Sequence, residues 1–387
     1  MNNKELGIYI HIPFCKQKCY YCDFISYVNK FDIIPKYIES VKKELDTYDF
    51  SKKNITTIYI GGGTPSFIPS KEIVSILEKL KQKLKNNKTK WEDLETTIEI
   101  NPGTATYEAL NDYKKVGINR LSIGLQSSNN ERLKQIGRIH TKEEFINTYN
   151  MAERVGFKNK NIDLMIGLPE QTIEEIKQDL DFVINLNPTH ISVYSLIVEE
   201  GTKIEKMITS GKLKLPDEEL ERNMYWYVKN TLELNGYTHY EISNFAKKGK
   251  ESKHNLNCWE QKEYIGLGVA AHSYFNSIRY GNTNNLKKYI DFNWENYEEA
   301  EEKEIRIIEE IQDLEEKQKE YMLLGLRKIE GVSIQKFKEK YVENPIFIFR
   351  KELEKLVEEN LLEIDGDKIK LTNKGLDLAN LVWEEFI

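Results

Sequence analysis

The sequence predicts an α/β fold, a partial (β/α)6 barrel followed by a small winged-helix-like α+β module. Six strand-then-helix units follow one another through about residue 200, which indicates parallel strands joined by right-handed crossovers. Every polar motif in these units comes directly after a strand, where a β/α barrel carries its functional residues. Near the C-terminus, three helical segments and a hairpin indicate the second module.

The six expected strands are short apolar runs. The first, Leu6–Ile12, has no polar interruption until His11, which fits a strand buried on both faces. Tyr9 and His11 alternate with isoleucines in this run, so we expect both to face the barrel interior. The other strands are expected at Thr56–Ile60, Thr97–Ile100, Arg120–Leu125, Asn161–Ile166 and His190–Ile197.

Helix signals follow these strands. Pro35–Tyr48 has apolar residues at helical spacing. Ser70 is expected to cap the helix after the second strand. Two later helices begin with the capping boxes Thr141–Glu144 and Thr172–Glu175.

We expect three parts in the chain. Residues 1–200 form the partial barrel with a cysteine-containing loop, residues 201–299 extend the barrel, and residues 300–387 form a charged helical linker and the winged-helix-like module. The extension begins with an amphipathic helix at Pro216–Leu234. The elements expected in the last part are helices at Lys319–Arg327, Ser333–Tyr341 and Ile346–Glu359 and a hairpin turning at Asp365-Gly366.

Charge and composition exclude several classes of protein. The 387 residues carry a formal net charge of −7, so no global basic field attracts nucleic acid. The last module is also acidic, with 13 Lys and Arg against 16 Asp and Glu in residues 315–387. No run approaches the ~18 apolar residues of a membrane span, and the first six residues lack the layout of a signal peptide. Together with unpaired cysteines, these features predict a cytoplasmic protein.

Three of the four cysteines lie directly after the first strand, in the spacing C-x3-C-x2-C at Cys15, Cys19 and Cys22. A loop this tight and an odd number of thiols do not suit disulfides. Three thiolates do suit a [4Fe-4S] cluster with one iron left open to another ligand. The alternatives are a redox C-x2-C pair and a zinc loop, for which His11 is the one nearby candidate for a fourth ligand.

This spacing resembles the signature of the radical S-adenosylmethionine (radical SAM) superfamily. The segments His11-Ile-Pro-Phe-Cys15 and Tyr21-Cys22-Asp-Phe24 resemble the branch that contains oxygen-independent coproporphyrinogen III oxidases and HemW-type heme chaperones. The resemblance covers most of the chain. It implies an open, partial barrel, a [4Fe-4S] cluster held by the three cysteines, and S-adenosylmethionine bound at the open iron.

The resemblance also implies which residues contact S-adenosylmethionine. Gly61-Gly-Gly-Thr-Pro65 resembles the family's GGGTP motif, in which glycines let the backbone approach a ligand. Arg138 suits the methionyl carboxylate because a guanidinium donates two parallel hydrogen bonds. Glu99, Gln126 and Asp163 would accept hydrogen bonds from the amine or the ribose hydroxyls of the cofactor. The alternative for each is a buried polar residue whose hydrogen bonds are made by its neighbours. The full set of expected contacts is Tyr9, Phe24, Gly63, Thr64, Glu99, Gln126, Arg138 and Asp163.

Two departures from the oxidases favour the chaperones of this branch. The oxidases carry an additional cysteine where this chain has Phe24, and a long N-terminal extension where only eight residues precede Tyr9. The segment His254-Asn-Leu-Asn-Cys258-Trp259 resembles the chaperones' heme-associated H-N-x-x-Y-W motif, with Cys258 in place of tyrosine. We expect Lys247–Asn257, which contains His254, to be an exposed loop. His254 or Cys258 would then bind heme iron, and Trp259 would cover the porphyrin. The alternative is a surface histidine with a buried cysteine.

The resemblance therefore implies a cytoplasmic heme chaperone that binds heme, a [4Fe-4S] cluster and S-adenosylmethionine, and passes heme to an acceptor protein, which could be membrane-associated. The alternative is an oxygen-independent coproporphyrinogen III oxidase, which decarboxylates two propionates to give protoporphyrinogen IX. A radical SAM methyltransferase is a third hypothesis. No catalytic residue is assigned.

Overall fold

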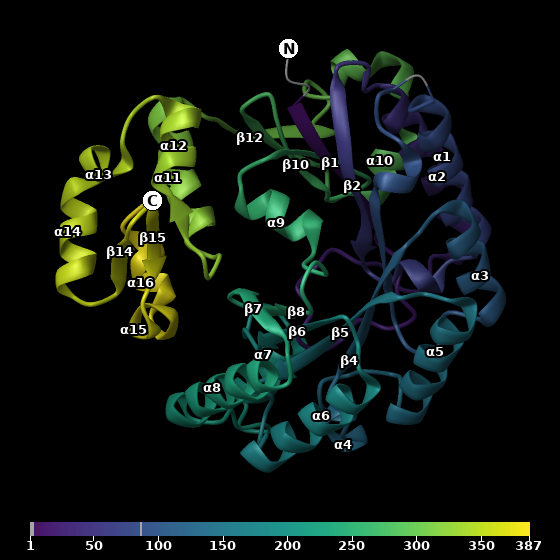
Figure 1. Ribbon diagram of the computed structural model, residues 1–387. Helices are drawn as coiled ribbons and strands as arrows, with labels where there is room; N and C mark the ends of the chain where they lie inside the picture. Colours follow the sequence, from purple (N-terminus) through teal and green to yellow (C-terminus); the bar gives the residue numbers. More distant parts are fainter. Residues whose placement is uncertain (1–3, 86) are drawn as a thin grey trace.

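The computed structural model describes residues 4–85 and 87–387, so the first three residues of the segment considered as a signal peptide lie outside it (Figure 1). The described strands form one sheet of twelve, in the order β12-β11-β10-β9-β1-β2-β3-β4-β5-β6-β8-β7, and one of three, in the order β13-β15-β14. The strands are β1 (Lys4–Ile12), β2 (Lys53–Gly62), β3 (Glu95–Ile100), β4 (Arg120–Gln126), β5 (Asn159–Ile166), β6 (His190–Ser195), β7 (Thr238–Glu241), β8 (Asn244–Ala246), β9 (Glu263–Leu267), β10 (His272–Phe275), β11 (Ile278–Asn282), β12 (Arg306–Ile311), β13 (Val332–Ser333), β14 (Leu362–Asp365) and β15 (Lys368–Leu371).

The six predicted strands are β1 to β6, and each pairs in parallel with the next. The prediction of an α/β fold built on a partial barrel is thereby confirmed. Helices cover the outer side of the sheet, and Figure 1 shows α1, α2, α3, α5 and α6 following one another around it. The helices are α1 (Ile34–Asp46), α2 (Ser70–Lys83), α3 (Tyr107–Val116), α4 (Asn130–Gln135), α5 (Lys142–Val155), α6 (Ile173–Leu186), α7 (Lys203–Thr209), α8 (Glu218–Leu234), α9 (Lys253–Trp259), α10 (Leu286–Asp291), α11 (Leu314–Gly325), α12 (Ile334–Tyr341), α13 (Pro345–Ile348), α14 (Arg350–Glu358), α15 (Asn373–Asp377) and α16 (Ala379–Glu384).

Side-chain alternation in the strands separates an apolar outer face from a polar inner face. In β1, Ile8 and Ile10 are fully buried in the same core as Ile38 of α1. Tyr9 and His11 point to the other side, where the Tyr9 hydroxyl lies 3.0 Å from His11 Nδ1. Successive side chains of a strand face opposite sides, so the barrel interior receives the polar residues.

Strands beyond the six extend the sheet at both edges. The strand β9 pairs in parallel with β1 on the side away from β2, and β10, β11 and β12 continue from it in antiparallel fashion. At the opposite edge, β8 pairs antiparallel with β6. The inner face of the barrel therefore continues across β9 to β12.

The two predicted capping boxes are confirmed at the starts of α5 and α6. The predicted capping role of Ser70 is wrong. Ser70 is the first residue of α2, and Pro69 occupies the capping position. The Ser70 hydroxyl instead donates to Asp112 of α3 at 2.7 Å, so it ties two neighbouring helices together.

The prediction of a helical linker from residue 300 is also wrong, because Arg306–Ile311 forms the edge strand β12. The C-terminal module has its own apolar core, which contains Met322, Phe337 and Ile369. The predicted hairpin is present as β14 and β15. The predicted third helix is divided into α13 and α14 at Phe349, whose backbone is not helical. Figure 1 shows the module beside α9 and β12.

Within the described ranges, no helix combines the length and the apolar surface that a membrane crossing requires.

Candidate functional site

The cysteine-containing loop leaves the carboxyl end of β1 and is fastened at both ends. Its two ends pair with each other, because the Cys15 N–H donates to the Tyr27 carbonyl at 3.0 Å. In the middle, the Tyr20 N–H donates to the Ile136 carbonyl at 2.9 Å. The loop therefore lies between the carboxyl end of β1 and the segment that follows β4.

The three predicted cluster ligands are free thiols; Cys15 is buried, and Cys19 and Cys22 are partly exposed. Burial raises the pKa of Cys15, and it raises the pKa of Cys22 to about 11. Both thiols are therefore neutral at pH 7 until a metal ionises them, as metals do on binding thiols. The structure thus keeps three unpaired sulfurs in one loop at the mouth of the barrel.

In the described part of the chain, no group of three or more His, Cys, Asp or Glu side chains is arranged to bind a single metal ion. In particular, His11 is 4% exposed, and its Nε2 pairs with the Ile25 carbonyl at 3.1 Å. The zinc alternative therefore lacks its fourth ligand. A [4Fe-4S] cluster binds each thiolate through a different iron, so its ligands need not converge on one point.

Beside this loop, a pocket opens at the carboxyl ends of β2, β3, β4 and β5. Six of the expected contact residues line it together, joined by three polar or small residues that sequence analysis did not assign. The expected residues are Gly63, Thr64, Glu99, Gln126, Arg138 and Asp163, and the added ones are Asn101, Ser122 and Gly124. Parallel strands place their carboxyl ends at one edge, which is why motifs 100 residues apart in sequence meet here.

Arg138 provides a fixed cation in the pocket. Its Nη2 donates to Asn101 Oδ1 at 2.8 Å and to the Gly124 carbonyl at 2.9 Å, and Nη1 lies 3.6 Å from Cys19 Sγ. Burial opposes the charge, but Tyr21, Cys19 and Asp163 hold the pKa of Arg138 above its usual value. Its buried Nε has no hydrogen-bond partner among the described residues. This guanidinium can therefore donate to an anionic group of a ligand.

Two buried carboxylates face the same pocket. Glu99 accepts hydrogen bonds from the Tyr59 hydroxyl at 3.0 Å and the Gly62 N–H at 3.1 Å. Burial, and then the nearby Asp163 charge, raise the pKa of Glu99 to about 7. Burial also raises the pKa of Asp163, although Asn161 donates to it at 2.6 Å. Neither carboxylate forms an ion pair with a described residue, so a cationic ligand group would stabilise both.

The glycine-rich turn brings β2 against the cysteine loop. Gly62 has a φ of +111°, and a Cβ there would lie 2.5 Å from the His11 ring. A Cβ on Gly63 would lie 3.0 Å from Cys15 Sγ. The Thr64 hydroxyl, at the end of the turn, lies 3.6 Å from the same sulfur. Glycine is therefore needed for the two loops to approach each other.

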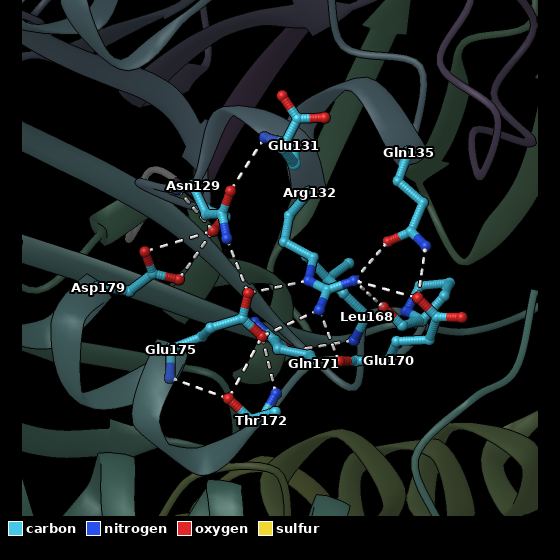
Figure 2. A network of polar contacts seen from close by, with 12 residues as sticks. Asn129, Glu131, Arg132, Gln135, Leu168, Glu170, Gln171, Thr172, Glu175 and Asp179 are labelled. Atoms are coloured by element: carbon cyan, nitrogen blue, oxygen red, sulfur yellow. Dashed lines mark hydrogen bonds and ion pairs between the residues drawn. The ribbon is translucent and has the colours of Figure 1, made fainter.

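A polar network fixes the segment after β4 (Figure 2). Arg132 of α4 donates to Glu175 of α6 at 3.0 Å and to the Glu170 carbonyl at 2.7 Å. Asn129 also donates to Glu175, at 2.7 Å. The network therefore holds α4 to the start of α6.

Two of the expected contact residues do not line the pocket. Tyr9 lies inside the barrel against Tyr59, with ring centroids 6.3 Å apart. Phe24 is 63% exposed. Of the lining residues that sequence analysis missed, Asn101 directly follows β3, and this position was the signal that could have found it.

The prediction that His254 lies in an exposed loop is wrong. Residues 253–259 form α9, and His254 is 8% exposed at the inner face of the sheet. Its Nδ1 lies 2.9 Å from the Thr57 hydroxyl, and its ring stacks on Tyr59 with centroids 5.1 Å apart. Burial lowers its pKa to about 4. The amphipathic turn of α9, capped by Ser252, carries the ring into the barrel, so a porphyrin cannot reach it in this conformation.

Cys258 and Trp259, the other two residues expected to contact heme, also pack within the protein. Cys258 is partly buried, and burial raises the pKa of its thiol to about 11. Trp259, expected to cover a porphyrin, is stacked by Arg327 of the C-terminal module at 4.5 Å. The segment thus packs the barrel against the module.

Comparisons with known proteins agree with this architecture. The radical SAM superfamily profile matches residues 9–183, and the HemN C-terminal domain profile matches residues 312–378. The solved structure of coproporphyrinogen III oxidase (HemN) from Escherichia coli superposes with a TM-score of 0.83, at 23% identity over 99% of this chain and 90% of that chain. The fold is therefore that of a radical SAM protein.

Full-length relatives define the family further. The chain is 37% identical to the heme chaperone HemW of Lactococcus lactis, over 100% of this chain and 98% of the relative. It is 36% identical to the heme chaperone HemW of Bacillus subtilis, over 98% of each. The chain belongs to the HemW family, which confirms the resemblance seen in its motifs.

Proposed function

We propose that this protein is a cytoplasmic heme chaperone that binds heme together with a [4Fe-4S] cluster and exchangeable S-adenosylmethionine, and passes heme to an acceptor protein. Full-length relatives named as heme chaperones support the proposal. The observation that carries the cofactor part is the convergence of six residues from β2 to β5 and the segments that follow them on one pocket beside three free thiols.

The pocket fits S-adenosylmethionine by charge. Arg138 would hold the methionyl carboxylate, because its Nε has no partner in the described part of the chain and its Nη2 is already fixed by Asn101 and Gly124. Glu99 and Asp163 would accept from the amine or the ribose, and Cys15, Cys19 and Cys22 would hold the cluster. When bound to a reduced cluster, S-adenosylmethionine supplies a 5′-deoxyadenosyl radical in the superfamily. The residues of this chain orient the cofactor and keep its charged end out of water.

One experiment separates the chaperone from the oxidase alternative. Cluster-reconstituted protein without a histidine tag is titrated with hemin, followed by absorbance, and is separately reduced and incubated with coproporphyrinogen III and S-adenosylmethionine. We expect saturable hemin binding and no protoporphyrinogen IX. Product that depends on S-adenosylmethionine would establish the oxidase activity, and absence of hemin binding would remove the chaperone proposal.

A further inference from the structure

The histidines differ sharply in accessibility. Five of the six lie buried: His11, His140, His190, His239 and His254. The side chain of the sixth, His272, is 61% exposed. Heme iron in proteins is commonly bound by a neutral imidazole nitrogen. Without refolding of the chain, His272 is the histidine that an external ligand can reach.

His272 lies on the inner face of the extended sheet, near the mouth of the barrel. It is the first residue of β10, two residues before Tyr274, and Tyr274 pairs with Tyr264 of β9, which pairs in turn with Gly7 of β1 on the face of Tyr9 and His11. Across the strands, His272 pairs with Gly281 of β11, and Gly281 pairs with Ile307 of β12. Directly paired residues of antiparallel strands share a face, so these three form one row.

A carboxylate fixes the orientation of the imidazole. His272 Nδ1 lies 2.9 Å from Glu309 Oε1, whereas Nε2 has no hydrogen bond or ion pair with any described residue. An Nδ1–H that donates to a carboxylate leaves Nε2 with its lone pair. Metal-binding histidines are held in this form by such partners, which also raise the basicity of the ligating nitrogen.

Gly281 makes room for this arrangement. A Cβ at Gly281 would lie 2.9 Å from Glu309 Oε1 and 3.1 Å from His272 Cε1. The carboxylate–imidazole pair therefore crosses β11 over bare backbone. Beyond it, Ile307 is 47% exposed on the same face. The row thus places an imidazole nitrogen without a described partner beside a partly exposed apolar side chain, a combination that suits an apolar macrocycle carrying a metal.

We propose that His272 Nε2 is an axial ligand of heme iron, that Glu309 positions the imidazole, and that the porphyrin lies over Gly281 and Ile307. This inference rests on the proposed function and assigns its heme ligand. A single histidine on an open face leaves the second axial position free. Heme held there is accessible to a ligand from an acceptor protein, as transfer of a cargo requires.

The test is a hemin titration of full-length, untagged protein, with the Soret band and the electron paramagnetic resonance spectrum recorded. His272→Ala should lower hemin affinity at least tenfold, about 1.4 kcal/mol, and change both spectra. Adding imidazole to His272→Ala should restore the parental Soret band, because free imidazole replaces the lost ligand. Gly281→Val should weaken binding by filling the space over β11. Glu310→Gln, a neighbouring change whose carboxylate pairs with Arg279 instead, is the matched control and should bind as the parent does.

The outcomes distinguish the inference from the function on which it rests. If the parent binds hemin and His272→Ala binds equally tightly with the same spectra, the ligand assignment is overturned and the chaperone proposal stands. Lower affinity with unchanged spectra overturns it as well, because His272 would then only shape the surface. A parent protein that binds no hemin overturns both.

Discussion

Removing the guanidinium of Arg138 should weaken S-adenosylmethionine binding more than any other single change in the pocket. A charge-assisted hydrogen bond contributes about 1.5–3 kcal/mol, which corresponds to a roughly 10- to 150-fold change in Kd. The structure favours the upper part of this range. The guanidinium is already fixed by Asn101 and Gly124, so little conformational entropy is lost when it binds a carboxylate. Arg138→Lys keeps the charge but not the planar set of donors, so it should restore only part of the affinity.

The assay is equilibrium dialysis of S-adenosylmethionine with cluster-reconstituted protein, with iron content and thermal unfolding measured on every variant. Arg132→Ala is the control, because Arg132 holds α4 to α6 without lining the pocket. It should lower the unfolding temperature and leave Kd within about threefold, a change below 1 kcal/mol. Unchanged affinity in an Arg138→Ala protein that retains its iron would refute the assigned role.

Three further outcomes are expected. Replacing Cys15, Cys19 or Cys22 by Ala should abolish the cluster, about four irons per chain, whereas Cys258→Ala should retain it; loss of iron in the Cys258 variant would mean that a ligand is misplaced. Glu99 has a pKa of about 7, so it takes up a proton as the pH falls through 7, and S-adenosylmethionine affinity measured by dialysis should decrease from pH 8 to pH 6. Glu99→Gln should flatten this dependence, and an equally steep dependence in that variant would exclude Glu99 as its source. Glu44→Ala should lower the free energy of unfolding by at least about 2 kcal/mol, because it leaves the buried donors Gly268 N–H, Asn282 Nδ2 and Tyr289 hydroxyl without their acceptor; denaturant titration with an unchanged midpoint would contradict this.

The barrel and its pocket could be predicted because their signals are local and repeated. In β1, the alternation of isoleucines with Tyr9 and His11 determines which side chains face the interior, and the structure agrees. Gly63 directly follows β2, and Glu99 and Asp163 lie on β3 and β5. Since parallel strands align their carboxyl ends, strand order brought these three residues to one pocket. Arg138 lies beyond α4 and was expected there only from the family resemblance.

The edge strand β12 could not be predicted in the same way. The run Arg306-Ile-Ile-Glu-Glu-Ile311 is charged and partly exposed, and local composition favoured a helical linker. It is a strand because β11 offers an unpaired edge and Ile307 and Ile308 pair with Gly281 and Tyr280. Strand propensity depends on such cross-strand neighbours more than on the residue itself. The partner strand lies about thirty residues earlier in the chain, so no local window contains both.

The exposure of single histidine side chains also could not be predicted from the local sequence. His254 stands in a lysine-rich segment that predicts exposure, yet α9 turns its ring into the barrel, where Thr57 and Tyr59 contact it. His272, for which the sequence analysis made no prediction, has a side chain that is 61% exposed and pairs with Glu309. Both environments depend on residues of other strands, which no motif around either histidine reveals. A heme-associated motif can therefore identify the family although its own histidine is buried and an exposed histidine lies on another element. The hemin titration of His272→Ala tests this separation directly.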